Sequence, residues 1–115
     1  MDHTRIRFSL PYWKSELELE HGMALPDILK RLVIAYGLQP YDINNGNCDY
    51  FAEDFLFVAK KLGNPGRFFA TPEDEDLPGH CWAFVSGRHF DAEAPEGVGD
   101  WRELPIFKKC LQPSA

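Results

Sequence analysis

The chain has 115 residues, a formal net charge of −6 and a hydrophobic content of 44%, with aromatic residues making up 14%. This length and apolar content predict one folded domain spanning residues 1–115, and they exclude a disordered chain. The acidic balance argues against a nucleic-acid partner, because binding to phosphates needs clustered positive charge.

The sequence also bears on the cellular compartment. No apolar run approaches the roughly 18 residues that a membrane-spanning helix needs, and the N-terminal residues lack the apolar core of a signal peptide. Three cysteines, an odd count, favour reduced thiols over a disulfide framework. We therefore expect a cytoplasmic protein with no membrane partner. The sequence leaves the oligomeric state open.

Residues 1–24 form an N-terminal segment with strand-like patterns. Polar and apolar residues alternate from Arg5 to Leu10, and Pro11 ends the pattern. This alternation predicts an edge strand or a packed arm. The mixed pattern that follows, up to Gly22, fits a strand better than a helix. We expect residues 1–24 to form an N-terminal arm of the domain, and the pattern from Arg5 to Leu10 indicates no function.

The next segment, from Pro26 to Gly37, has the signals of a helix. Proline is favoured in the first turn, and glycine commonly ends a helix. The apolar residues recur at helical spacing and define one buried face: Ile28, Leu29, Leu32, Val33 and Tyr36. We expect this helix to pack against the helix that follows it.

The connection from Leu38 to Asn47 is rich in amide side chains. Those of Gln39, Asn44, Asn45 and Asn47 are able to donate hydrogen bonds to an oxyanion, beside the backbone N–H of the following cysteine. The alternative is that the run Asn-Asn-Gly-Asn only forms a turn, which these residue types favour for local reasons.

A second helix is predicted from Cys48 to Leu62, with Asn47 as its N-cap and Gly63 just beyond its end. Its apolar stripe is Phe51, Ala52, Phe55, Leu56, Ala59 and Leu62. A thiol in the first helical turn meets unpaired N–H groups and the positive end of the helix dipole, which favour the thiolate. Cys48 is therefore a candidate nucleophile. The alternative is a small buried residue without chemistry.

Three strands are predicted after this helix. The first covers Arg67 to Thr71, and the other two cover residues 79–85 and 88–93, joined by a two-residue turn at Ser86-Gly87. Residues 94–100 read as a loop, and residues 101–109 are expected to pack back onto the sheet.

The turn fixes which residues of the two later strands face each other. It places Trp82 opposite Asp91, and His80 opposite Glu93, on one face of the sheet. His80 is then a diagonal neighbour of Asp91, within reach of a hydrogen bond. Trp82 and Glu93 are expected to shape the site. A cysteine, a histidine and a carboxylate that orients the imidazole are the parts of an activated thiol nucleophile.

Two other residues near the predicted site are given lesser roles. His89 shares the sheet face of Asp91 and is a second candidate base. Cys81 is expected to face the opposite side of the sheet from His80, which makes it a poor nucleophile. The cysteines and histidines lack zinc-binding spacing, so no metal site is predicted.

The motifs G-N-C-D-Y-F-A-E-D-F, K-K-L-G-N-P-G-R-F-F-A, G-H-C-W-A-F and F-D-A-E-A-P follow one another over residues 44–95. This order resembles the core of transglutaminase-like enzymes within the wider papain-like cysteine superfamily. The resemblance implies Cys48 as nucleophile, His80 as general base and then acid, and Asp91 as the orienting carboxylate. Such enzymes use an upstream Gln or Trp for the oxyanion, and Gln39 and Trp13 are the matching residues here.

The resulting expectation is an α+β fold with a papain-like core, in which two main helices pack on a small antiparallel sheet. The function expected is cysteine-dependent acyl transfer from a protein or peptide amide, as in a peptidase, amidase, deamidase or transglutaminase, without a metal or organic cofactor. Two alternatives are a non-catalytic binding or inhibitory module that retains the fold, and a structural domain in which Cys48 is buried.

Overall fold

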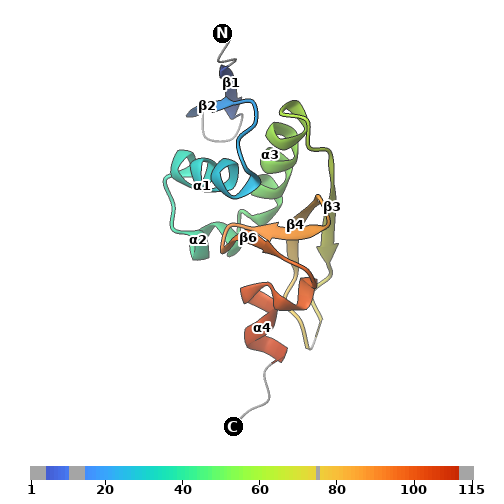
Figure 1. Cartoon of the computed structure of the whole chain (residues 1–115). Helices are drawn as coiled ribbons and strands as arrows, with labels where there is room; N and C mark the ends of the chain where they lie inside the picture. The colour runs from blue at the N-terminus through green and yellow to red at the C-terminus, as the bar shows by residue number, and fades with distance from the viewer. Residues whose placement is uncertain (1–4, 11–14, 75, 112–115) are drawn as a thin grey trace.

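Helices and antiparallel strands make up an α+β fold in the computed structural model, which describes residues 5–10, 15–74 and 76–111 (Figure 1). Six strands and five helices follow one another within the described ranges. Their bounds are β1 (Arg5–Leu10), β2 (Ser15–Glu20), α1 (Leu25–Tyr36), α2 (Pro40–Asn44), α3 (Cys48–Lys61), β3 (Gly66–Thr71), β4 (His80–Val85), β5 (Arg88–Asp91), β6 (Ala94–Val98), the 3₁₀ helix η1 (Trp101–Glu103) and α4 (Pro105–Leu111).

The N-terminal arm is an antiparallel hairpin of β1 and β2 at one end of the molecule (Figure 1). Phe8 pairs with Leu17, and both side chains are buried in the main core together with Leu19. The strand patterns in this segment are thereby confirmed. The alternation explains the packing, because it gives the hairpin one apolar face and one charged face.

The two helices expected from the sequence are confirmed as α1 and α3. Gly37 ends α1 in the left-handed conformation with φ of 71°, which glycine adopts without strain. The two helices contact each other, and Tyr36 donates a buried hydrogen bond to Asp54 between them. α2, a helix of five residues, lies in the segment that we expected to be a loop only.

The main sheet is antiparallel with the strand order β3-β4-β5-β6. Ser86 and Gly87 both have positive φ, 52° and 77°, as expected of the turn type that joins two-residue hairpins. The predicted register is confirmed where Ala83 pairs with Phe90. The strand β6 was not expected, and residues 94–98 are therefore not the loop that we predicted.

Helices cover both faces of this sheet. On one face, Ala83, Val85 and Phe90 join α1 and α3 in the larger core cluster. On the other face, Trp82 packs with Leu104, which lies just before α4, and with Phe107 of α4 in a smaller cluster. This confirms that the chain after residue 100 packs back onto the sheet. The side chains of neighbouring β4 residues point to opposite faces of the sheet. The first residues of β4 therefore lie close to the helices on both faces.

The longest helix of the described ranges, α3, has 14 residues. None of the helices in these ranges combines the length and the apolar character that crossing a membrane requires.

Candidate active site

Cys48 is the first residue of α3, and its side chain is half-buried. The first hydrogen bond of the helix runs from the backbone N–H of Phe51 to the carbonyl of Asn47. The backbone N–H of Cys48 therefore precedes the hydrogen-bonded ladder, as at any helix start. This N–H and the positive end of the helix dipole lie beside the thiol, which is the environment that favours a thiolate.

Asn47 occupies the N-cap position, but its side chain makes no capping hydrogen bond. The predicted N-cap position of Asn47 is therefore confirmed, although its side chain does not make the hydrogen bond that usually accompanies it. The reason is local: its φ and ψ of −124° and 14° depart from the extended conformation that a capping side chain usually needs.

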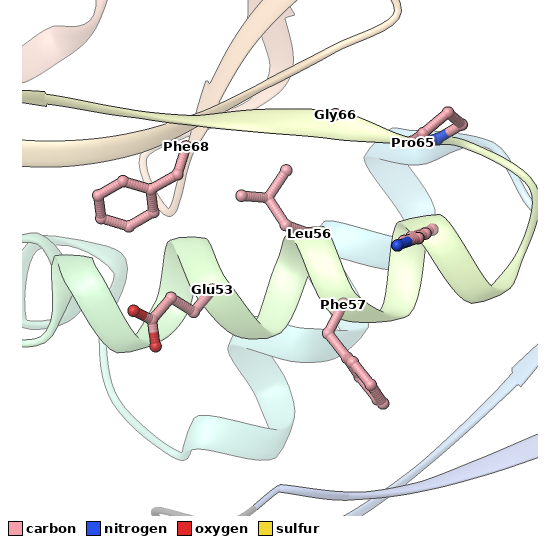
Figure 2. Close-up of a pocket in the computed structure, with 7 residues that line it drawn as sticks. Glu53, Leu56, Phe57, Pro65, Gly66 and Phe68 are labelled. Carbon is pink, nitrogen blue, oxygen red and sulfur yellow. The ribbon is translucent and has the colours of Figure 1, made fainter.

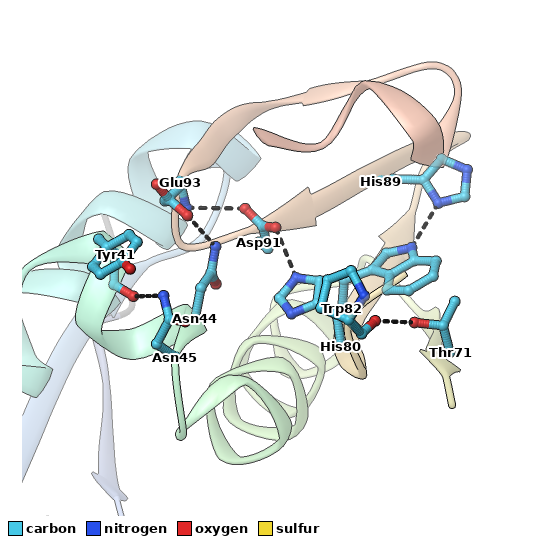
Figure 3. Close-up of polar contacts among 10 residues, drawn as sticks. Tyr41, Asn44, Asn45, Thr71, His80, Trp82, His89, Asp91 and Glu93 are labelled. Carbon is cyan, nitrogen blue, oxygen red and sulfur yellow. Dashed lines mark hydrogen bonds and ion pairs between the residues drawn. The ribbon is translucent and has the colours of Figure 1, made fainter. Parts of the chain in front are cut away.

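His80 and Asp91 form the buried polar contact that the strand register predicted. His80 Nε2 lies 2.9 Å from Asp91 Oδ2, and both residues are almost wholly buried, at 1% and 3% exposure (Figure 3). The second oxygen of Asp91 accepts a hydrogen bond of 2.9 Å from the backbone N–H of Glu93. Asp91 is thus fixed by two donors, and it holds the imidazole of His80 in one orientation.

The other nitrogen of His80, Nδ1, is buried and has no hydrogen-bond partner of good geometry among the described residues. Asn44 Oδ1 is the second such buried side-chain atom in these ranges. Buried polar atoms in folded proteins are nearly always paired, so an orphan needs an explanation. For His80, the explanation is the thiol of Cys48, with which the ring interacts electrostatically.

The two groups shift each other's protonation. Burial lowers the pKa of His80, but its interactions with Asp91 and Cys48 outweigh this and raise the pKa to about 9. Burial raises the pKa of Cys48, whereas the interactions with His80 and with Cys81 lower it, and the net shift is downward. Both directions favour a thiolate of Cys48 paired with a charged imidazole of His80 near neutral pH.

Trp82 covers His80 from one side. The two rings are stacked, with centroids 5.9 Å apart, and Phe107 meets both rings edge-on. The indole N–H of Trp82 donates a hydrogen bond of 2.9 Å to His89 Nδ1. His89 is therefore engaged with Trp82, and His80, not His89, carries the contact with Asp91 (Figure 3).

Glu93 does not lie opposite His80, so this part of our interpretation is wrong. β5 ends at Asp91, and Ala92 and Glu93 form the turn into β6. Glu93 still borders the site, because its backbone holds Asp91 and its carboxylate accepts a hydrogen bond of 2.9 Å from Asn44 Nδ2 (Figure 3). Asn44, from α2, thereby ties the turn to the segment that leads into α3.

The side chains expected to stabilise an oxyanion are placed differently. The amide donor of Asn44 is already bound to Glu93, and that of Asn45 is bound to the carbonyl of Tyr41. Gln39 precedes α2 as its N-cap residue and is exposed. Trp13 lies outside the described residues. Asn47 directly precedes Cys48, and its side chain makes no capping hydrogen bond. The side-chain amide of Asn47 and the backbone N–H of Cys48 are therefore the two candidate donors at the start of α3.

Sequence reasoning missed the position of Cys81. Its side chain does face the opposite side of the sheet from His80, as expected, but this is the side on which α3 packs. Cys81 and Cys48 line the same narrow gap, which is too small to hold a water molecule, together with Asn44 and Asp91. Burial and the nearby charge of Cys48 raise the pKa of Cys81 to about 11, so its thiol is protonated at neutral pH.

A wider groove of about 390 Å³ lies between α3 and β3, away from this arrangement (Figure 2). It is mainly apolar, and Phe57 and Phe68 are among its exposed side chains. Its lining residues are Glu53, Leu56, Phe57, Lys60, Pro65, Gly66 and Phe68. The groove contains neither cysteine nor histidine, so it does not offer a nucleophile.

No group of three or more His, Cys, Asp or Glu side chains within residues 5–10, 15–74 and 76–111 is arranged to hold a metal ion. No protein-family model matches the chain, and neither a curated protein nor a solved structure matches it. The chemical interpretation of Cys48, His80 and Asp91 therefore depends on their geometry and on the sequence motifs.

Proposed function

We propose that this chain is a cysteine-dependent acyl-transfer enzyme that acts on a protein or peptide amide, with a papain-like core of the transglutaminase-like type. The observation that carries the proposal is the unpaired Nδ1 of buried His80 beside the thiol of Cys48, while Asp91 occupies the other ring nitrogen. A structural histidine would be expected to have both ring nitrogens satisfied.

The thiolate of Cys48 attacks the carbonyl carbon of the amide in the first step. Negative charge then develops on the carbonyl oxygen, and the backbone N–H at the start of α3 donates a hydrogen bond that stabilises it. His80 Nδ1 gives its proton to the leaving amine, and a thioester on Cys48 remains. Asp91 keeps the ring oriented throughout and stabilises its charged form.

Release of the thioester reverses the role of His80. Now neutral, its Nδ1 takes a proton from the incoming water or amine, which attacks the thioester carbonyl. Water gives hydrolysis, as in a peptidase, amidase or deamidase, and an amine gives transfer, as in a transglutaminase. The thiol leaves as thiolate, and the charged pair of Cys48 and His80 is restored.

The test uses p-nitrophenyl acetate, an activated ester that acylates reactive thiolates. We expect a rapid release of p-nitrophenol equivalent to one acyl group per chain, located on Cys48 by mass spectrometry. Cys48→Ala should abolish this phase, while Cys110→Ser, which changes an exposed thiol, should leave it unchanged. Equal acylation of the wild type and Cys48→Ala would refute the proposal.

A non-catalytic binding module is the second candidate, and the groove between α3 and β3 favours it. Large exposed apolar side chains such as Phe57 and Phe68 are typical of interaction sites. This alternative predicts an ordinary thiol at Cys48, with a pKa near the usual cysteine value of about 8.5. The acylation test therefore separates the two candidates.

A further inference from the structure

Cys81 is a nucleophilic side chain that the proposed reaction does not use. It lies in β4 next to His80, it is half-buried, and it faces α3 across the narrow gap that it lines with Cys48. Asn44 and Asp91 line the same gap, so Cys81 reaches the immediate surroundings of the reactive thiol. Two neighbouring thiols can be oxidised to a disulfide within one chain, which a single cysteine cannot form.

The third cysteine provides a contrast within the same chain. Cys110 is exposed in α4, and its thiol donates a hydrogen bond of 3.5 Å to the carbonyl of Ile106 one helical turn earlier. α4 packs on the sheet face that carries Trp82, opposite the face on which α3 lies. Cys110 is therefore separated from Cys48 by the sheet, whereas Cys81 is adjacent to Cys48.

We propose that Cys48 and Cys81 form a peroxide-driven disulfide that reversibly switches off the Cys48 nucleophile. The proposal rests on the proposed function in one respect, since it requires Cys48 to be a reactive thiolate. It adds that Cys81 is a resolving thiol, and that the site is a redox-sensitive modification site as well as a catalytic one.

The chemistry takes two balanced steps. In the first, the thiolate of Cys48 attacks one oxygen of hydrogen peroxide, the O–O bond breaks, and a sulfenic acid on Cys48 and hydroxide are formed. In the second, the sulfur of Cys81 attacks the sulfenic sulfur, the S–O bond breaks, and a disulfide forms. The Cys81 proton and the departing hydroxide leave together as water.

The surroundings favour the second step once the first has occurred. The charge of Cys48 is one of the causes that raise the pKa of Cys81, after burial, and a neutral sulfenic acid removes this charge. Cys81 then loses its proton more readily than it does beside the thiolate. The charged His80, which interacts with Cys48, is able to relay this proton: it gives its own proton to the departing hydroxide and regains one from Cys81.

The experiment treats the reduced full-length chain with a small excess of hydrogen peroxide, blocks free thiols with iodoacetamide, and maps the cysteines by tryptic digestion and mass spectrometry. Cleavage after Lys60 and Arg67 separates Cys48 from Cys81. We expect a linked pair of peptides containing Cys48 and Cys81, and complete recovery of both thiols with dithiothreitol. Non-reducing electrophoresis should show that the link lies within one chain.

Two variants sharpen the test. Cys81→Ser should convert reversible loss of the Cys48 thiol into accumulation of sulfinic acid, which dithiothreitol does not reduce. Cys110→Ser should behave like the wild type. Formation of the same sulfinic acid in the wild type and Cys81→Ser, or a link between Cys48 and Cys110, would overturn the proposal.

Failure of this inference is distinguishable from failure of the proposed function. If acylation by p-nitrophenyl acetate occurs at Cys48 but peroxide yields no internal disulfide, the nucleophile stands and the switch is refuted. If neither acylation nor peroxide oxidation occurs at Cys48, the thiol is unreactive and both proposals fall.

Discussion

Two buried pairs in this molecule each consist of a carboxylate and a ring side chain. They differ in whether the ring carries a second polar atom without a hydrogen-bond partner. Tyr36 donates a hydrogen bond to Asp54 between α1 and α3, inside the larger core cluster. His80 binds Asp91 at the start of β4, and its second ring nitrogen has no partner of good hydrogen-bond geometry. The first pair connects two helices, whereas in our proposal the second orients an imidazole towards the thiol of Cys48.

The electrostatics of the two pairs differ accordingly. Burial raises the pKa of Asp54, and the hydrogen bond from Tyr36 only partly opposes this, so the pKa of this carboxyl lies above its usual value. For His80, burial lowers the pKa, but Asp91 and Cys48 reverse the shift and favour the charged ring. We therefore propose that a buried polar pair serves structure or chemistry depending on whether a third reactive group completes it.

The largest effect is expected from His80→Gln, which retains a polar side chain but removes the base. We expect acylation of Cys48 by p-nitrophenyl acetate at pH 6 to slow by about a hundredfold or more, because both the thiolate fraction and general acid–base catalysis are lost. Stopped-flow absorbance of p-nitrophenol measures this rate. Circular dichroism verifies that the variant is folded, and a rate within twofold of the wild type would contradict the role of His80.

Asp91→Asn should have an intermediate effect. The amide removes the negative charge beside His80, so the pKa of His80 should fall from about 9 towards the usual histidine value of 6.5. We expect the acylation rate near pH 7 to fall roughly tenfold, in line with about one pKa unit. An NMR titration of the histidine ring signals, with His80→Gln to assign His80, measures the shift directly.

The same variant should change how stability depends on pH. Since the folded state raises the pKa of His80, the stability that this contributes is complete below about pH 6.5 and is lost as pH rises through about 9. Asp91→Asn should flatten the decline of the unfolding free energy in this window. Urea unfolding at several pH values tests this, and an unchanged slope would mean that Asp91 does not hold the charge of His80.

Tyr36→Phe should affect stability alone. The variant removes the donor to Asp54 and leaves a buried carboxyl without this partner, which is expected to cost about 1–2 kcal/mol of unfolding free energy. The reaction of Cys48 with p-nitrophenyl acetate should not change in the folded protein. A slowed reaction at full folding would show that the two pairs are coupled, against our comparison.

The smallest effect is expected from Asp54→Asn. Because the folded state raises the pKa of Asp54, its stabilising contribution is present below about pH 4 and is lost as pH rises through the folded value. The amide does not ionise, so the variant should gain stability relative to the wild type between about pH 4 and 7, by less than about 1 kcal/mol. If the difference in unfolding free energy between Asp54→Asn and the wild type did not change with pH, this would contradict the raised pKa of Asp54.

The sequence predicted the parts of this site that depend on local signals. Gly37 marked the end of α1, and the Ser86-Gly87 turn set the register of β4 and β5. The contact between His80 and Asp91 followed from this register, because a short turn fixes which residues of the two strands pair.

Other features required tertiary information. β6 contains Pro95 and Gly97, two residue types that are rare in strands. The sheet tolerates them because β6 is an edge strand. The place of Cys81 beside Cys48 depends on which sheet face α3 covers, and no local pattern states this. Asn44 was recognised as a polar residue near Cys48, but its bond to Glu93 joins segments far apart in the chain.

The most direct test of the central claim is the pH dependence of alkylation of Cys48 by iodoacetamide, measured from about pH 4 to 10 in the wild type, His80→Gln and Tyr36→Phe. Mass spectrometry of the separate tryptic peptides follows Cys48 without replacing Cys81. We expect the Cys48 thiol to titrate well below the ordinary cysteine pKa of about 8.5 in the wild type and Tyr36→Phe, and near that value in His80→Gln. The same ordinary titration in all three proteins would contradict an activated nucleophile.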